Sequence, residues 1–213
     1  MPVITRLVQQ RRSPSRRSVF IDGRFAFALS LNVVARFRLR EGMTLTEQQV
    51  VQIRDGEARQ ECMDAALAFL GRRLHSRAEL ERKLGRAEYA PQAIQDVLAE
   101  LERLGYVDDA RFARTRALSA AQHRHHGRQR AFLELVKAGV SREVADRALD
   151  EVYGQANGLE VARQLALKQA ARLRRLDPRV ARRRLAGMLQ RRGFDYETVR
   201  HIVDQALGGS EPD

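Results

Sequence analysis

Three segments of this sequence repeat one another at spacings of 51 and 54 residues, and this repetition restricts the folds open to the chain. The segments are ERKLGRAEYA, ELVKAGVS and AGMLQRRGFD, with Tyr89, Val140 and Phe194 at one equivalent position. Other matched apolar positions are Leu80, Ala131 and Leu185; Leu84, Leu135 and Leu189; and Leu98, Leu149 and Val203. A period near 50 residues indicates a helical array in which each repeat buries its apolar face against its neighbours.

Each repeat is predicted to contain three helices, because start signals recur where the apolar periodicity begins. Ser76 with Glu79 forms a capping box, and Asp177 is an N-cap residue followed by Pro178 in the first turn. The predicted helices cover residues 57–73, 76–86 and 91–105; 109–123, 127–138 and 141–152; and 160–176, 178–192 and 195–207.

The first thirty residues differ from the rest because their apolar residues alternate with polar ones, as in half-buried strands. VITRLVQ is one such run, and RSVFIDGRFAFAL holds two more around Asp22-Gly23, a dipeptide typical of a tight hairpin turn. A helix through LNVVARFRL, capped by Ser30 and stopped at Gly42, is predicted to follow. Thr46 and Gln49 form a possible capping box for a short helix to about Ile53.

The predicted fold is therefore mainly α: tandem three-helix repeats, preceded by a small three-stranded antiparallel β-sheet with helices. We expect a β-sheet and helix domain at 1–55, an elongated array of repeats at 56–108, 109–157 and 158–208, and a disordered tail at 209–213.

The net charge of +12, from 39 basic and 27 acidic side chains, indicates a partner with negative charge. Phosphate backbones, acidic protein surfaces and anionic lipid are the candidates. The charge is uneven: residues 58–109 carry 8 basic and 10 acidic groups, whereas residues 160–207 carry 12 and 5. This asymmetry favours a directional binding surface. Only three of the basic residues are lysines, which a GC-rich genome would also produce.

Several classes of protein are excluded by composition. The single cysteine, Cys62, rules out a disulfide framework and a thiolate zinc site, so we expect a reducing compartment. No stretch approaches 18 consecutive apolar residues, and MPVITRLVQQ reads as a strand and not as a secretory signal. The expectation is a soluble, cytoplasmic protein without a membrane partner.

The stretch AQHRHHGRQR holds three histidines, His123, His125 and His126, at the turn between two predicted helices. A zinc site needs three or four converging ligands, and here no cysteine and no carboxylate nearer than Glu134 is available. We therefore predict no metal or other cofactor. Two interpretations remain: solvated residues at a helix–loop junction, or part of a contact surface whose charge rises at mildly acid pH.

Four segments, in this order along the chain, resemble the RecX family of bacterial recombinase regulators. They are IDGRFAFALS, SRAELERKL, LERLGYVDDARFAR and RRGFDYETV. The resemblance covers about residues 3–207. It implies a protein that is not an enzyme, has no small-molecule substrate, and binds filaments of RecA recombinase on DNA. It also implies restraint of strand exchange, ATP hydrolysis and co-protease activity, and hence roles in DNA repair, recombination and the SOS response.

The arginines are the candidate contacts with the filament or with DNA phosphates, to which guanidinium groups bind strongly. Gly127-Arg128-Gln129-Arg130 fits a segment where the resemblance expects a glycine followed by basic residues. The candidates are Arg128, Arg130, Arg174, Arg175, Arg179, Arg182, Arg183, Arg191 and Arg192, with Arg11, Arg12, Arg16 and Arg17 as weaker ones. A solvated helix face explains the charges of the third repeat equally well.

Two other functions remain open at this point. A nonspecific DNA-binding protein built from tandem helical modules would account for the charge, and its affinity would fall steeply with salt. A histidine-dependent metalloenzyme would require stoichiometric metal. No phosphate-binding loop, nucleophile elbow or dinucleotide fingerprint occurs in the sequence, and Asp108 and Asp109 are better explained as helix caps than as catalytic carboxylates.

Overall fold

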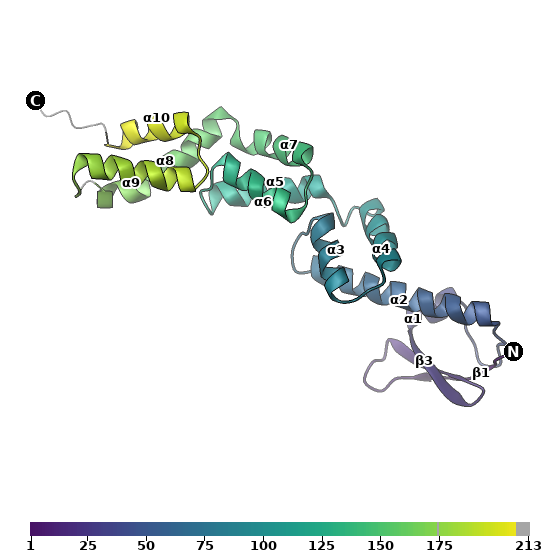
Figure 1. Cartoon of the computed structure of the whole chain (residues 1–213). Coiled ribbons are helices and arrows are strands. Elements are labelled where there is room, and N and C mark those ends of the chain that lie inside the picture. The colour runs from purple at the N-terminus through teal and green to yellow at the C-terminus, as the bar shows by residue number, and fades with distance from the viewer. Residues whose placement is uncertain (174, 208–213) are drawn as a thin grey trace, which may run out of the picture. The chain divides into compact units, whose positions relative to one another are not determined.

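The computed structural model of the chain describes residues 1–173 and 175–207 (Figure 1). Its residues form two compact units, one of residues 1–73 and 80–106, the other of residues 74–79 and those from 107 onward. Arg174 and the predicted tail at 209–213 lie outside the described residues. No helix among the described residues is both long and apolar enough to cross a membrane.

The predicted three-stranded antiparallel sheet is confirmed. Its strands β1 (Ile4–Gln9), β2 (Arg16–Ile21) and β3 (Arg24–Ser30) are hydrogen-bonded in the order β1-β2-β3. Asp22 and Gly23 both have positive φ, of 50° and 81°, which is the turn geometry expected for a two-residue hairpin. One face of the sheet buries Ile4, Val19 and Leu29 against the helices that follow.

Helix α1 (Leu31–Arg36) begins at Ser30, whose hydroxyl accepts a hydrogen bond from the Val33 N–H. It is shorter than the sequence predicts, since Arg38 has a φ of 48°, a left-handed conformation that a continuing helix excludes.

Helix α2 (Glu47–Leu70) corrects the sequence prediction of two helices separated near Gly56. The predicted capping box of Thr46 and Gln49 is present at its start, but the helix then runs through Gly56 without a break. Gly56 is needed for packing, because a Cβ there would lie 2.8 Å from the ring of Phe37. The predicted domain boundary at 55/56 falls inside this helix.

Eight further helices follow α2 in the described chain, as the repeats predict. They are α3 (Arg77–Arg86), α4 (Pro91–Arg103), α5 (Asp109–Gln122), α6 (Arg128–Ala138), α7 (Arg142–Tyr153), α8 (Gln155–Leu173), α9 (Pro178–Arg191) and α10 (Tyr196–Leu207). All the matched apolar positions are buried except Tyr89, which is half-buried. Helices α5–α7 enclose one apolar core and α8–α10 another.

The middle helix of each repeat ends in the same way, which explains why the matched segments align. Glu88, Gly139 and Gly193 have positive φ values of 62°, 90° and 86°. The next residue in each repeat donates its N–H back to the helix: Tyr89 to the Leu84 carbonyl, Val140 to Leu135, and Phe194 to Leu189. This left-handed helix end turns the chain so that the following apolar residue enters the core.

Candidate partner-binding surface

Helix α9 carries an exposed basic face in the third repeat. Arg179 and Arg183 lie one turn apart on this face, and Arg175 precedes the helix. All three are exposed, and none of their guanidinium groups has a hydrogen-bond or ion-pair partner among the described residues. On the opposite side of α9, Leu185 and Leu189 are buried in the core of the repeat, as predicted. These three guanidinium groups are therefore free to bind another molecule.

Arg182, another predicted candidate on α9, is instead paired within the repeat. Its guanidinium donates a hydrogen bond to the carboxylate of Asp204 on α10. Both side chains are about half exposed, so the pair contributes little to stability. Its effect is to hold the Arg182 side chain against α10.

Arg128 is also occupied by carboxylates of its own repeat. It stands at the start of α6, and its Nη2 lies 2.9 Å from Asp146 and 2.7 Å from Asp150 on α7. These hydrogen bonds raise the pKa of Arg128 above its ordinary value. The arrangement joins α6 to α7, so Arg128 has a structural use that sequence reasoning did not foresee.

The remaining predicted arginines of this region lie where the second repeat meets the third. Arg130 donates from Nη1 to the Arg191 carbonyl at 3.1 Å, and Arg192 donates to the Arg124 carbonyl. The Arg191 side chain is exposed and has no partner among the described residues. At this junction the two donating guanidinium groups tie the repeats together.

Backbone atoms make the closest contacts of the same junction. The Gly127 N–H, at the start of α6, donates to the Arg192 carbonyl at 2.7 Å, and the Gln129 N–H donates to the Gly193 carbonyl. The carbonyl groups at the end of α9 thus meet the N–H groups at the start of α6, an arrangement that favours both helix dipoles. An added Cβ on Gly127 would overlap the Gly193 backbone.

Of the four N-terminal arginines, two have no partner among the described residues and two are paired. Arg11 and Arg12 are exposed in the loop between β1 and β2, without a partner among the described residues. Arg16 lies 3.0 Å from both Glu57 and Glu61 on α2, and Arg17 donates to the Pro14 carbonyl. Arg16 therefore fastens the sheet to α2.

The interpretation of the histidines as solvated residues is wrong for His126, which is 6% exposed. Its Nδ1 lies 3.0 Å from Oε1 of Glu134, although the two atoms are not aligned for a hydrogen bond. The hydroxyl of buried Tyr153 donates to the His126 carbonyl at 2.9 Å, and burial raises the pKa of Tyr153 to about 12. His75, 51 residues earlier, is also buried and pairs with Glu79. The equivalent positions of these two histidines in the repeats could therefore have indicated a structural role for His126.

His125 faces a different set of groups, so the two histidines do not converge on one point. Its backbone is left-handed, with a φ of 47°, and its Nε2 lies 2.8 Å from the Lys168 ammonium on α8. The ammonium has no lone pair, so this hydrogen bond requires a neutral imidazole. Among the described residues, no three histidine, cysteine or acidic side chains gather as a metal site requires.

Both histidines make this junction sensitive to acid. Burial and then the Lys168 charge lower the pKa of His125. Burial also lowers the pKa of His126, aided by Arg130, Arg124 and Arg192 and opposed by Glu134. Because both pKa values lie below the ordinary 6.5, the unfolded chain binds more protons than the folded one near that pH. The histidines thus stabilise the fold fully above pH 6.5, and this contribution is lost as the pH falls below it.

We therefore expect the second unit to unfold at a lower temperature at pH 5.5 than at pH 7.5, partly through these histidines. The double variant His125→Gln/His126→Gln should show a smaller difference between the two pH values. His201→Gln, which changes an exposed histidine on α10, is the control. Thermal unfolding followed by circular dichroism measures the difference. An equal pH dependence in the double variant and in the wild type would contradict the expectation.

Fold and site together define a protein of tandem three-helix repeats with an N-terminal sheet domain and a free basic surface on its last repeat. Comparison with known families gives four matches in order along the chain. The matching family models are the Regulatory protein RecX N-terminal domain (residues 2–46) and the first (62–101), second (108–149) and third (156–203) RecX three-helix domains. The chain belongs to the RecX family of regulatory proteins.

Curated relatives agree with this assignment, and solved structures share the fold. Regulatory protein RecX of Leuconostoc citreum is 30% identical over 205 residues, which cover 96% of this chain and 76% of that protein. The corresponding protein of Bacillus subtilis is 26% identical, with 96% and 77% covered. A crystal structure of regulatory protein RecX shares the fold, with a TM-score of 0.78 and 22% identity over 96% of this chain and 100% of that one. RecX from Lactobacillus salivarius gives a TM-score of 0.65 at 22% identity, covering 71% and 97%.

Proposed function

We propose that this protein binds filaments of RecA recombinase on DNA in the cytoplasm and restrains their strand exchange, ATP hydrolysis and co-protease activity. By this activity it regulates DNA repair, recombination and the SOS response. It acts by binding and not by catalysis. The observation that carries the proposal is the ordered series of four RecX domain matches along the chain. The free arginines of the third repeat supply a surface of suitable charge.

Arg175, Arg179 and Arg183 are the proposed primary contacts, because their guanidinium groups have no partner to give up among residues 1–173 and 175–207. Each can form charge-assisted hydrogen bonds to acidic side chains of the recombinase or to DNA phosphates. Arg11, Arg12 and Arg191 are exposed in the same way and are secondary candidates. Arg16, Arg128, Arg130, Arg182 and Arg192 would have to leave the partners described above, so we place them last.

Replacing Arg179 and Arg183 with glutamate is expected to weaken inhibition of the RecA ATPase on single-stranded DNA about 10- to 100-fold. The physical reason is the loss of two charge-assisted contacts, each worth about 1.5–3 kcal/mol, less what solvent screening removes. The loss of inhibition is measured as the half-inhibitory concentration of the variant and of the wild type, at substoichiometric ratios to RecA. Helical content should stay unchanged, because both side chains are exposed.

The matched control is Arg86→Glu/Arg103→Glu, which makes the same change of net charge on exposed positions of the first repeat. It should inhibit like the wild type. Equal inhibition by both double variants would move the contact surface away from α9. The proposed function itself is wrong if the wild-type protein leaves the ATPase unchanged, or if its affinities for bare DNA and for filaments are equal at matched salt.

A further inference from the structure

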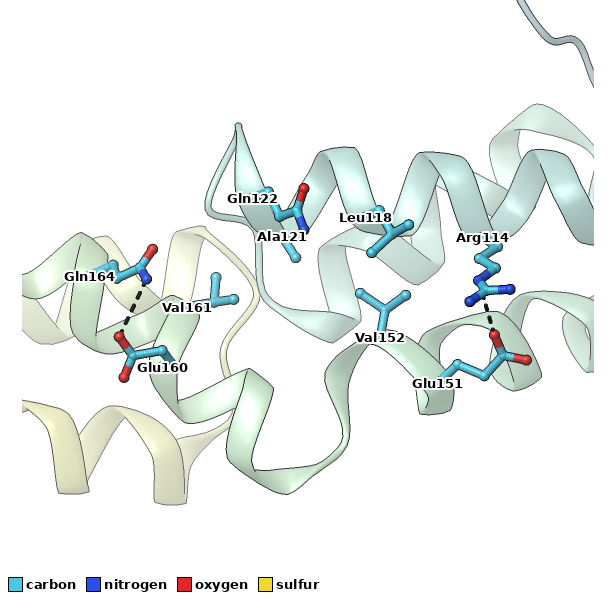
Figure 2. A pocket seen from close by; sticks show the side chains of 9 residues that line it. All are labelled: Arg114, Leu118, Ala121, Gln122, Glu151, Val152, Glu160, Val161 and Gln164. Atoms are coloured by element: carbon cyan, nitrogen blue, oxygen red, sulfur yellow. Dashed lines mark hydrogen bonds and ion pairs between the residues drawn. The ribbon is translucent and has the colours of Figure 1, made fainter.

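A pocket of about 270 Å³ opens where α5, α7 and α8 meet, within the second unit (Figure 2). Its apolar part comes from all three helices: Leu118 and Ala121 on α5, Val152 on α7, and Val161 on α8. Ala121 and Val152 are buried, whereas Leu118 is 37% exposed. The pocket therefore offers a small apolar floor to solvent.

The polar groups of the pocket stand at its edges. Figure 2 shows Glu151 beside Arg114 at one end and Glu160 beside Gln164 at the other, with the valines between them. Arg114 approaches Glu151 at 3.4 Å, and Arg163, outside the lining, approaches Glu160 at 3.6 Å. All four charged side chains are more than half exposed, so an incoming group exchanges these contacts at little cost.

A volume of about 270 Å³ is large enough to take one long side chain. An apolar floor between two carboxylates suits a side chain with an aliphatic stem and a positively charged head. Two of the three charged groups that line the pocket are carboxylates, Glu151 and Glu160, and they disfavour a phosphate group there although the chain as a whole carries a charge of +12. The pocket therefore favours a positively charged group, whereas the α9 arginines favour a negatively charged one.

We propose that this pocket binds an arginine or lysine side chain of the protein partner. The stem packs on Leu118, Val152 and Val161, and the cation pairs with Glu151 or with Glu160 at one end of the pocket. The inference rests on the proposed function and deepens it, since it assigns the pocket to the recombinase and excludes DNA from it. Because the pocket is lined by both the second and the third repeat, an occupied pocket also joins the two.

The charge-reversal variant Glu151→Lys/Glu160→Lys tests the inference. It makes an already basic chain more basic, so any contact with phosphate or with acidic surface should strengthen. If the pocket binds a cation, the variant should instead bind the filament at least 10-fold more weakly than the wild type. Its binding to bare single-stranded DNA should be unchanged or tighter. Fluorescence anisotropy on RecA filaments and on bare DNA at the same salt concentration gives both values.

Glu143→Lys/Glu197→Lys is the matched control, because it reverses two exposed carboxylates of the same unit outside this pocket. It should not weaken filament binding. If Glu151→Lys/Glu160→Lys binds filaments as well as or better than the wild type, the pocket inference is wrong while the proposed function stands. If the wild type does not bind filaments, both are wrong.

A crosslinking experiment identifies the occupant directly. Cys62 is the only cysteine and is fully buried, so Gln122→Cys provides one reactive thiol at the edge of the pocket. A short photo-crosslinker on this thiol should attach to a RecA segment that contains an exposed arginine or lysine. Arg103→Cys, on α4, should not label that segment. Attachment to DNA, or to a second copy of this chain, would overturn the proposal.

Discussion

Replacing Gly127 with alanine is expected to destabilise the second unit by about 2–4 kcal/mol. The Gly127 backbone is extended, with a φ of −74°, so alanine itself is not strained there. The cost comes from the new Cβ, which would lie 2.5 Å from the Phe194 nitrogen and overlap the Gly193 carbonyl. The turn after α9 must move away from α6, which loses two backbone hydrogen bonds at about 0.5–1.5 kcal/mol each, besides the cost of overpacking.

Gly85→Ala is the control for this variant. Gly85 lies within α3, and a Cβ there would meet nothing within 4 Å. Alanine should therefore stabilise its helix by about 0.5–1 kcal/mol. Hydrogen exchange separates the two effects: in Gly127→Ala the Gly127 and Gln129 amides should lose protection first, because their acceptors move away. Unchanged protection of both amides would show that the junction tolerates the methyl group.

The fold was predictable from the sequence because its signals are local or periodic. The spacing of matched apolar residues gave the three repeats, and Asp22-Gly23 gave the hairpin. The continuity of α2 was missed because one helix was predicted to end near Ile53 and the next to begin at residue 57, after Gly56. Only the approach of the Phe37 ring, from a segment 19 residues earlier, shows why a glycine stands there.

The candidate site was predictable only as a set of basic residues. Arg179 and Arg182 look alike in sequence, yet Asp204, 22 residues beyond Arg182, pairs with one of them and leaves the other free. Such pairings depend on which helices pack together. The pocket was missed for the same reason, because its lining comes from three helices and contains no motif.

Glu57 and Glu61 lie one turn apart on α2 and contact the same arginine, but we expect only Glu57 to be needed to hold the sheet. The side chain of Glu57 is 9% exposed, and its Oε2 accepts hydrogen bonds from the Ser30 N–H at 2.8 Å and the Ser30 hydroxyl at 3.0 Å. Nη2 of Arg16 donates to Glu61 and to the Ala28 carbonyl. Oε1 of Glu57 therefore interacts with Arg16 through charge, without an aligned hydrogen bond.

Glu57→Ala is accordingly expected to destabilise the first unit by about 2–4 kcal/mol, because the Ser30 N–H loses its acceptor and Arg16 loses its buried counterion. Glu61→Ala should cost less than about 1 kcal/mol. Glu61 is 45% exposed, and its loss frees an Arg16 hydrogen to turn toward Glu57. Urea unfolding compares the free energies of unfolding of the two variants, and hydrogen exchange in β2 and β3 shows where each variant is destabilised. Equal destabilisation by both would mean that the sheet is held by Arg16 itself and not by the buried carboxylate.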